Sequence, residues 1–83
     1  MKYKITFKRS VVRDLKKIGK KEAEKLLKNI AKQLPSEAIN CPQLKGRFKG
    51  LRKYRIGNYR VIFALLKDTV LITRIGHRKI IYK

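Results

Sequence analysis

The stretch that decides the fold is residues 51–66, which read LRKYRIGNYRVIFALL. Gly57 and Asn58 lie between two runs of strand-forming residues, and two such residues with glycine first are typical of a tight β-hairpin turn. This turn pairs Arg55 with Arg60 across the two strands. Because side chains alternate between the two faces of a sheet, the cations of the hairpin separate from its apolar residues.

The two faces of this hairpin differ in chemistry. One carries the cations Lys53, Arg55 and Arg60, and the other carries aromatic and branched side chains suited to packing on helices, namely Tyr54, Ile56, Tyr59, Val61 and Phe63. Like charges at directly opposite positions destabilise a purely structural sheet. A solvated basic face with splayed side chains is one explanation. A bound phosphate would relieve the repulsion and also explain the clustering, so we expect an anion site here.

The chain before this hairpin predicts a strand and two helices. Residues 2–8, KYKITFK, alternate between polar and apolar, which is typical of a half-buried strand. Ser10 is a candidate N-cap for a short helix that ends at Gly19. A second helix follows, with an apolar stripe at helical spacing, and we expect Pro35 to end it.

A loop and a further strand complete the pattern. Residues 35–50 contain two prolines and two glycines, which favours a loop, and we expect Leu44 and Phe48 to anchor it in the core. Residues 69–77, TVLITRIGH, predict a strand that precedes a short tail. The order β-α-α-β-β-β predicts one small α+β domain over residues 1–83, with two helices on one face of a mainly antiparallel sheet. The other face of the sheet stays open.

The charge of the chain is its strongest compositional signal. The 83 residues hold 24 Lys and Arg against 5 Asp and Glu, a formal net charge of +19. Clustered cations favour a polyanionic partner, because binding to phosphates releases condensed counterions. A membrane surface is another polyanion, but the sequence has no run of about 20 apolar residues, and residues 1–4 lead directly into a strand pattern. We therefore expect a soluble, cytoplasmic protein with no membrane partner.

Cys41 is the only cysteine, so the chain can form no intrachain disulfide and no thiolate zinc cluster. No local signature supports a nucleophilic role, and the one histidine lies far along the chain. We expect a half-buried loop thiol, and a protein that uses no metal and no cofactor.

His77 is the one residue of the type that titrates near neutrality, and it precedes Arg78. If residues 67–68 form a two-residue turn, His77 shares the open face with Arg60, and Arg78 points away. A bulge at Gly76 would exchange the two faces beyond it. The pattern leaves open whether His77 or Arg78 faces the groove.

Two blocks of sequence resemble a known family. They are QLKGRFKGLRKYRIGNYRVIF at residues 43–63 and RIGHRKIIY at residues 74–82. Together they resemble the RelE/ParE toxin superfamily of type II toxin-antitoxin systems, nearer its RelE-type messenger-RNA endonucleases. The resemblance covers nearly the whole chain. It implies a microbial-RNase-like fold, ribosome-dependent cleavage of mRNA, and neutralisation by a cognate antitoxin whose acidic or amphipathic segment wraps the toxin.

The resemblance also implies the residues that carry activity. The family uses a cation on the strand that enters the hairpin, the arginine after its GxY, the arginine of HR and a tyrosine near the C-terminus; these positions are Lys53, Arg55, Arg60, Arg78 and Tyr82. The implied reaction is metal-free attack of the ribose 2'-hydroxyl on the adjacent phosphate, which needs a base, stabilisation of a charged phosphorane and an acid. The three hairpin cations suit the stabilisation, Arg78 suits the leaving group, and Tyr82 could stack on a base.

The general base is the step that the resemblance explains least well. The family lysine proposed for it aligns with Arg55, and a guanidinium essentially never loses its proton in a protein. His77, or Lys53 among its neighbouring cations, is the better proton acceptor. None of the 5 acidic residues lies in either block. We therefore expect a slow nuclease away from the ribosome.

Two other functions fit parts of the sequence. A ParE-like toxin would poison DNA gyrase by binding it, without nuclease chemistry, and a shared fold does not separate it from a nuclease. DNA damage signalling with intact mRNA would identify that function. A non-catalytic RNA-binding module needs only the charge, and it predicts salt-dependent binding without cleavage.

Overall fold

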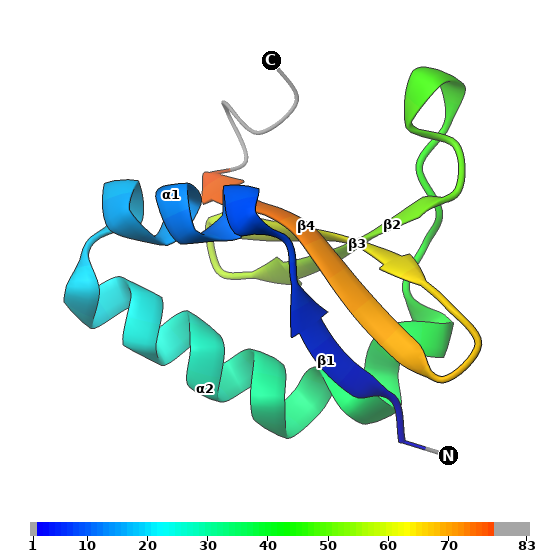
Figure 1. Cartoon of the computed structure of the whole chain (residues 1–83), viewed down its shortest axis with the longest axis horizontal. Helices are drawn as coiled ribbons and strands as arrows, with labels where there is room; N and C mark the ends of the chain where they lie inside the picture. The colour runs from blue at the N-terminus through cyan, green and yellow to red at the C-terminus, as the bar shows by residue number, and fades with distance from the viewer. Residues whose placement is uncertain (1, 78–83) are drawn as a thin grey trace.

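The computed structural model describes residues 2–77, which form one mixed sheet and two α-helices (Figure 1). In chain order the elements are β1 (Lys4–Phe7), α1 (Arg9–Ile18), α2 (Lys20–Glu37), the 3₁₀ turns η1 (Ala38–Asn40) and η2 (Gly46–Phe48), β2 (Leu51–Ile56), β3 (Tyr59–Leu65) and β4 (Thr69–His77). The sheet order is β1-β4-β3-β2, with β1 parallel to β4 and the other neighbours antiparallel. The predicted α+β class and β-α-α-β-β-β order are confirmed.

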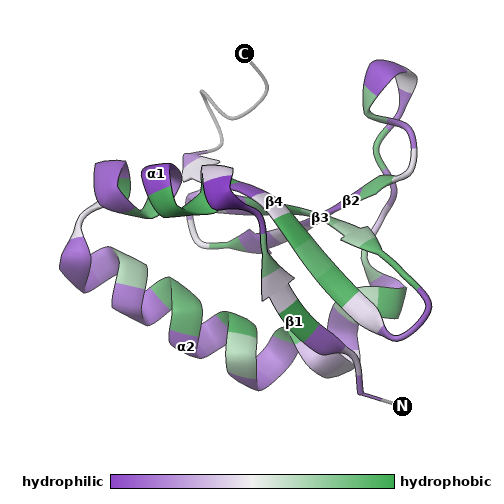
Figure 2. Cartoon of the chain, in the orientation of Figure 1, coloured by the Kyte–Doolittle hydropathy of each residue, from purple (hydrophilic) through white to green (hydrophobic). Residues whose placement is uncertain are grey.

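The hydrophobic core lies between the sheet and the helices. Its most deeply buried members are Val61, Phe63, Val70 and Ile72 from the strands and Val11, Ile30 and Leu34 from the helices. In Figure 2, the first half of β4 contains a continuous hydrophobic stretch, whereas α2 alternates between hydrophilic and hydrophobic residues. Such alternation is typical of a helix that buries one stripe and exposes the rest to solvent.

The hairpin between β2 and β3 has the predicted register. Gly57 has a φ of 57°, which costs glycine nothing and most other residues a great deal. Arg55 pairs with Arg60, and Tyr54 pairs with Val61. Val61 belongs to the core and Tyr54 packs against it, so the apolar face of the hairpin turns toward the helices. The cations of the hairpin therefore lie on the face that the helices leave uncovered.

Ser10 does not cap α1, contrary to our expectation. The N-cap is Lys8, and the Ser10 hydroxyl instead donates a hydrogen bond to the carbonyl oxygen of Thr73 at 2.8 Å. The reason is the free edge of β4 beyond the end of β1, where strand backbone groups still need partners. The predicted end of α1 at Gly19 is confirmed, with a φ of 101° at that residue.

Pro35 does not end α2, because the helix continues to Glu37. The φ of proline is compatible with a helix. Because Pro35 lies close to the end of α2, its missing N–H removes only one hydrogen bond of the last turn. Leu34 still accepts a hydrogen bond from the N–H of Ala38, and the Pro35 carbonyl accepts one from the N–H of Tyr3 at 3.0 Å. No helix in the described part of the chain is long and apolar enough to cross a membrane.

The loop from α2 to β2 is anchored differently from our expectation. Leu44 and Phe48 are only half-buried and lie outside the core cluster, whereas Ala38 and Cys41 are buried in it. Residues at the start of the loop pack inward because they continue directly from the buried face of α2. Cys41 is thus more buried than the predicted half-buried thiol. Burial raises the pKa of this thiol; the nearby Glu37 carboxylate raises it further, and Arg52 opposes the shift.

A β-bulge interrupts the pairing of β3 with β4. Phe63 pairs with Ile72 and Ile62 pairs with Arg74, so Thr73 is the extra residue on β4. Its hydroxyl donates to the carbonyl oxygen of Ile62 at 3.1 Å. An extra residue exchanges the two faces of the strand beyond it, which decides where the end of β4 points.

Candidate active site

The candidate site is a small cavity on the open face of the sheet. It has a volume of about 130 Å³ and is lined by Pro42, Lys53, Arg55 and Arg60. Small-molecule sites usually exceed roughly 300 Å³, so this cavity fits a single phosphate-sized group better than a whole organic ligand. Three of its four lining residues are cations, and the predicted hairpin trio is therefore brought together in one place.

The strand geometry sets the positions of these cations. Arg55 and Arg60 face each other across the β2–β3 pair, and Lys53 lies two residues before Arg55 on the same face. Arg55 is exposed, while Lys53 and Arg60 are half-buried. A guanidinium presents several N–H donors in a rigid plane, so two opposed arginines suit an anion with several acceptor oxygens.

The loop before β2 forms one wall of the cavity. The Pro42 carbonyl accepts a hydrogen bond from the N–H of Lys53 at 3.1 Å, and an isolated bridge pairs Gln43 with Arg52. The Arg52 guanidinium donates to the carbonyl oxygens of Ile39 at 3.2 Å and Cys41 at 2.8 Å. These contacts hold the loop along the outer edge of β2, so Pro42 has a fixed place beside the cations.

His77 lies on the opposite face from Arg60. Its partner across the strands is Tyr59, and the two rings make an edge contact with centroids 5.9 Å apart and planes at 76°. Gly76 is the residue opposite Arg60. The turn at residues 67–68 has the predicted two-residue form, with the N–H of Leu66 bonded to the Thr69 carbonyl oxygen. Of the two alternatives that the sequence left open for His77, the structure shows the one in which it turns away from the open face.

The bulge explains this difference. We considered a bulge at Gly76, which lies beyond most of the strand, but the bulge is at Thr73 and so exchanges the faces before His77 is reached. Ile75 accordingly turns into the core and is 1 % exposed. Arg78 and Tyr82, the other two residues of the predicted site, lie outside the described residues.

Asp14 is a residue that our sequence reasoning missed. It is buried on α1 and accepts hydrogen bonds from Arg74 Nε at 2.9 Å, from Arg74 Nη2 at 3.3 Å and from the N–H of Ile75 at 3.0 Å. It therefore fastens α1 to the strand segment just after the bulge. A signal was available, because position 14 falls on the inward face between Val11 and Leu15, where a lone acid needs a partner.

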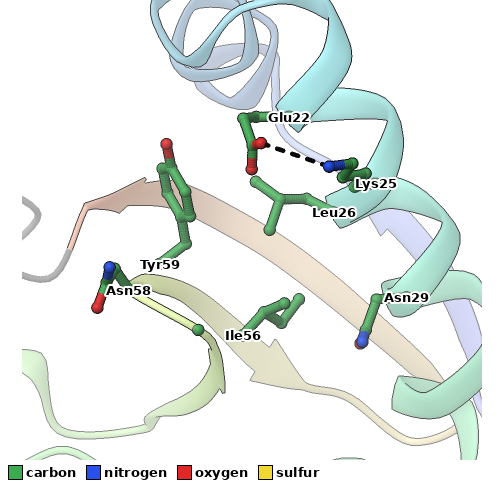
Figure 3. Close-up of a pocket in the computed structure, with 8 residues that line it drawn as sticks. Glu22, Lys25, Leu26, Asn29, Ile56, Asn58 and Tyr59 are labelled. Carbon is green, nitrogen blue, oxygen red and sulfur yellow. Dashed lines mark ion pairs between the residues drawn. The ribbon is translucent and has the colours of Figure 1, made fainter.

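A second, larger cavity lies on the helix side of the hairpin (Figure 3). Its volume is about 350 Å³, and its lining residues are Glu22, Lys25, Leu26, Asn29, Ile56, Gly57, Asn58 and Tyr59. Glu22 and Lys25 form an ion pair at 3.8 Å, and the Tyr54 hydroxyl donates to Asn29 Oδ1 at 2.8 Å. Because its charges are balanced, this cavity lacks the excess of cations that distinguishes the first.

Among residues 2–77, no cluster of three or more His, Cys, Asp or Glu side chains could hold a metal ion. Two of the acidic residues form ion pairs, Asp14 with Arg74 and Glu22 with Lys25. The carboxylates of Asp14 and Glu22 are thus engaged away from the cavity. What the cavity offers is concentrated positive charge on an accessible surface.

Comparison with known proteins identifies the family. The sequence model of the ParE toxin of the type II toxin-antitoxin system parDE matches residues 5–82. The chain belongs to this toxin family. The toxin is also 31 % identical to Toxin RelE3 of Methanocaldococcus jannaschii over 83 residues, which covers 95 % of this chain and 94 % of the relative. It is thus a type II toxin of the RelE/ParE superfamily, as its two motif blocks predicted.

Solved structures resemble the toxin along nearly its whole length. The RelBE2 toxin-antitoxin complex of Mycobacterium tuberculosis contains a chain with a TM-score of 0.86 and 25 % identity, covering 94 % of this toxin and 100 % of that chain. The RelB-RelE complex of Methanococcus jannaschii matches with a TM-score of 0.69 and 28 % identity, over 92 % of this toxin and 93 % of that chain. YafQ of E. coli, at 19 % identity and a TM-score of 0.69, covering 98 % and 99 %, shares the fold.

Proposed function

We propose that this toxin is a metal-independent endoribonuclease that cleaves mRNA on the ribosome and so arrests translation. The observation that carries the proposal is the cavity on the open face, where Lys53, Arg55 and Arg60 converge beside the Pro42 wall. The similarity to Toxin RelE3 supports the RelE-type reading. We propose that this reaction takes place in the cytoplasm.

The proposed reaction is an internal transfer at one phosphodiester. The ribose 2'-oxygen attacks phosphorus and loses its proton to a base, the bond from phosphorus to the 5'-oxygen breaks, and that oxygen takes a proton. The products are a 2',3'-cyclic phosphate and a free 5'-hydroxyl. Negative charge on the phosphorane oxygens is greatest in the transition state, and preorganised donors are most effective there. Arg55 and Arg60 supply those donors from opposite strands.

Lys53 is our proposed general base. It is the one cavity-lining residue whose side chain can become a neutral proton acceptor, because the other two cations are arginines. His77 contacts Tyr59 on the face of the sheet opposite the cavity, so we assign it no part in the proton transfer beside Arg60. Arg78 and Tyr82 lie beyond the described segment and keep their proposed roles. Arg78 acts at the leaving oxygen, and Tyr82 orients a nucleobase of the RNA.

The ribosome has a specific part in this proposal. The cavity is small and open, and the carboxylates of Asp14 and Glu22 are held elsewhere. Arginines stabilise charge but do not by themselves align a 2'-hydroxyl for in-line attack, and alignment contributes a large share of catalysis. We infer that the decoding site of the ribosome holds the mRNA in the reactive geometry.

A cognate antitoxin is the proposed protein partner. The similar chains of Mycobacterium tuberculosis and Methanococcus jannaschii are described as toxin-antitoxin complexes. A net charge of +19 favours an acidic partner through long-range attraction. We propose that such an antitoxin keeps the toxin inactive until it is removed.

Substitution of Arg60 tests the nuclease proposal. Arg60→Ala should abolish growth arrest on induced expression and remove the new mRNA ends that the wild-type toxin produces. The matched control is Arg13→Ala, which removes the same charge from an exposed position on α1 and should leave both effects unchanged. Full toxicity of Arg60→Ala would overturn the proposal. Intact mRNA together with DNA damage signalling would point to gyrase as the target instead.

A further inference from the structure

The cavity on the helix side of the hairpin is bounded by two facing walls (Figure 3). The ring of Tyr59 stands on one side, and Glu22 and Leu26 of α2 stand opposite it. Ile56 of β2 also lines the space, whose volume is about 350 Å³. A space between an aromatic wall and an aliphatic wall suits a flat ring, which can pack against both. We call this cavity the slot.

The Tyr59 ring is held in place by its neighbours in the fold. It is half-buried and packs against the hydrophobic core. The His77 ring makes an edge contact with it, at a centroid distance of 5.9 Å, which fixes its orientation further. A side chain that is already ordered loses little conformational entropy when a ligand binds. Tyr59 therefore offers a preorganised surface on which a planar ring can stack.

The slot is a close neighbour of the cation cavity. Arg60 lines the cation cavity and Tyr59 lines the slot. Because these residues are consecutive, their Cα atoms are about 3.8 Å apart and their side chains point to opposite faces of the sheet. The turn residues Gly57 and Asn58 also line the slot. An RNA strand that places a phosphate beside Arg60 can thus reach the slot by passing around the turn.

The charges of the two cavities differ in a way that matches two parts of a nucleotide. The cation cavity suits a phosphate, whereas Glu22 and Lys25 balance each other in the slot at 3.8 Å. An uncharged group therefore suits the slot better. The Glu22 carboxylate is 50 % exposed, and a carboxylate has several acceptor positions. It can accept a hydrogen bond from the amino group of cytosine, but it faces a carbonyl oxygen at the same position of uracil.

We propose that the slot binds one unstacked nucleobase of the RNA strand whose phosphate occupies the cation cavity, and that Glu22 selects a base with an amino group over uracil. Tyr59 stacks on the base, and Leu26 and Ile56 enclose it from α2 and β2. The inference rests on the proposal that the toxin acts on RNA, and it adds an element of base specificity to that proposal. It does not require the RNA to be cleaved.

Binding of two matched oligonucleotides tests the specificity. The probes are 2'-O-methyl oligomers of cytidine and of uridine of equal length, which cannot be cleaved because their 2'-oxygen cannot attack phosphorus. Fluorescence anisotropy should show at least about fivefold tighter binding of the cytidine oligomer to the full-length toxin. Equal affinities would overturn the slot proposal and leave the RNA proposal standing. Absence of binding to either oligomer would overturn both.

A pair of variants assigns the specificity to one carboxylate. Glu22→Gln should reduce the preference for the cytidine oligomer to less than about twofold. Glu24→Gln is the matched control, because Glu24 is also exposed on α2 and does not line the slot. Both substitutions raise the net charge equally, so long-range attraction to RNA changes alike in both. The control should keep the full preference. An unchanged preference in Glu22→Gln, or an equal loss in both variants, would contradict the proposal.

Nuclear magnetic resonance tests the location of the bound base in the unmodified toxin. The side-chain amide of Asn29 lines the slot from α2 and does not line the cation cavity. Its signals should shift when the cytidine oligomer is added, whereas the backbone amide of Val12, on the exposed side of α1, should not shift. Tyr59→Leu should also weaken binding of both oligomers about tenfold, because stacking is lost. Unshifted Asn29 signals in the presence of bound oligomer would overturn the proposal.

Discussion

At the scale of single residues, Asp14 joins α1 to β4. One carboxylate satisfies a backbone N–H at Ile75 and binds Arg74, while Ser10, four residues earlier, satisfies the carbonyl of Thr73. Residues four apart lie on one side of a helix. Two side chains of α1 therefore serve the edge of β4 where β1 has ended, much as a neighbouring strand would.

Replacing Asp14 should destabilise the toxin strongly. Asp14→Ala leaves the N–H of Ile75 without its acceptor, and an unsatisfied buried donor costs about 1–3 kcal/mol. We expect the free energy of unfolding in urea to fall by about 2–3 kcal/mol. Glu24→Ala removes an exposed carboxylate from α2 and should change it by less than about 0.5 kcal/mol. Equal effects of the two substitutions would show that the Asp14 contacts contribute little.

Cys41 should be inert in the folded toxin. The thiolate is the reactive form of cysteine, and burial raises the pKa of this thiol above its ordinary value of 9.0. In the folded toxin, iodoacetamide can reach this thiol only when the structure opens locally. Alkylation at pH 7.5 should therefore be at least ~100-fold slower than in urea-unfolded toxin. Because the unfolded thiol ionises first, the contribution of this thiol to stability is present below its ordinary pKa of 9.0 and declines as the pH rises above that value. Rapid native-state alkylation would contradict this burial.

At the scale of elements, the β2–β3 hairpin is the part that the sequence predicts best. Its turn residues, its register and its two faces follow from Gly57-Asn58 and from alternation alone, because a two-residue turn leaves one pairing available. The order of the helices and strands follows in the same way from periodicity. These local rules suffice wherever the chain obeys a regular period.

The elements that the sequence predicts poorly are those fixed by distant contacts. The bulge is at Thr73, a strand-forming residue with no bulge signal of its own, and it is held by Asp14 from α1. Position 76 has the more suggestive residue, a glycine, and shows no bulge. The face of His77 depends on this one residue. Pattern alone was therefore enough to bring Lys53, Arg55 and Arg60 together, but not to place His77, while Arg78 and Tyr82 lie outside the described residues.

Of the two turn residues of the hairpin, only Gly57 should be sensitive to substitution. Gly57→Ala places a side chain at a φ of 57° and should cost about 1–3 kcal/mol of unfolding free energy, because L-residues are strained there. Asn58 has no positive φ, so Asn58→Ala should cost less than about 0.5 kcal/mol. Chemical denaturation measures both values. A similar cost for both substitutions would show that the turn does not depend on the glycine.

At the scale of the whole molecule, charge should govern affinity for RNA. Binding to a short single-stranded RNA should weaken steeply as salt increases, and each phosphate contact contributes about 0.7 to the slope of log K against log salt. Arg60→Ala should therefore reduce the magnitude of that slope by about 0.7. Arg13→Ala, on the exposed surface of α1, is the control and should leave it unchanged. Fluorescence anisotropy at four salt concentrations measures the slopes, and identical slopes would place Arg60 outside the RNA contact.

The parallel pairing of β1 with β4 also has a consequence for the synthesis of the toxin on the ribosome. Residues 4–7 must wait for residues 69–72 before their strand has a neighbour, and the core residues Val70 and Ile72 arrive equally late. During synthesis the N-terminal part is made first and cannot finish its sheet alone. A nascent chain therefore remains incomplete while the ribosome that makes it is still at work. For a protein proposed to attack translation, this timing protects the ribosome that is producing it.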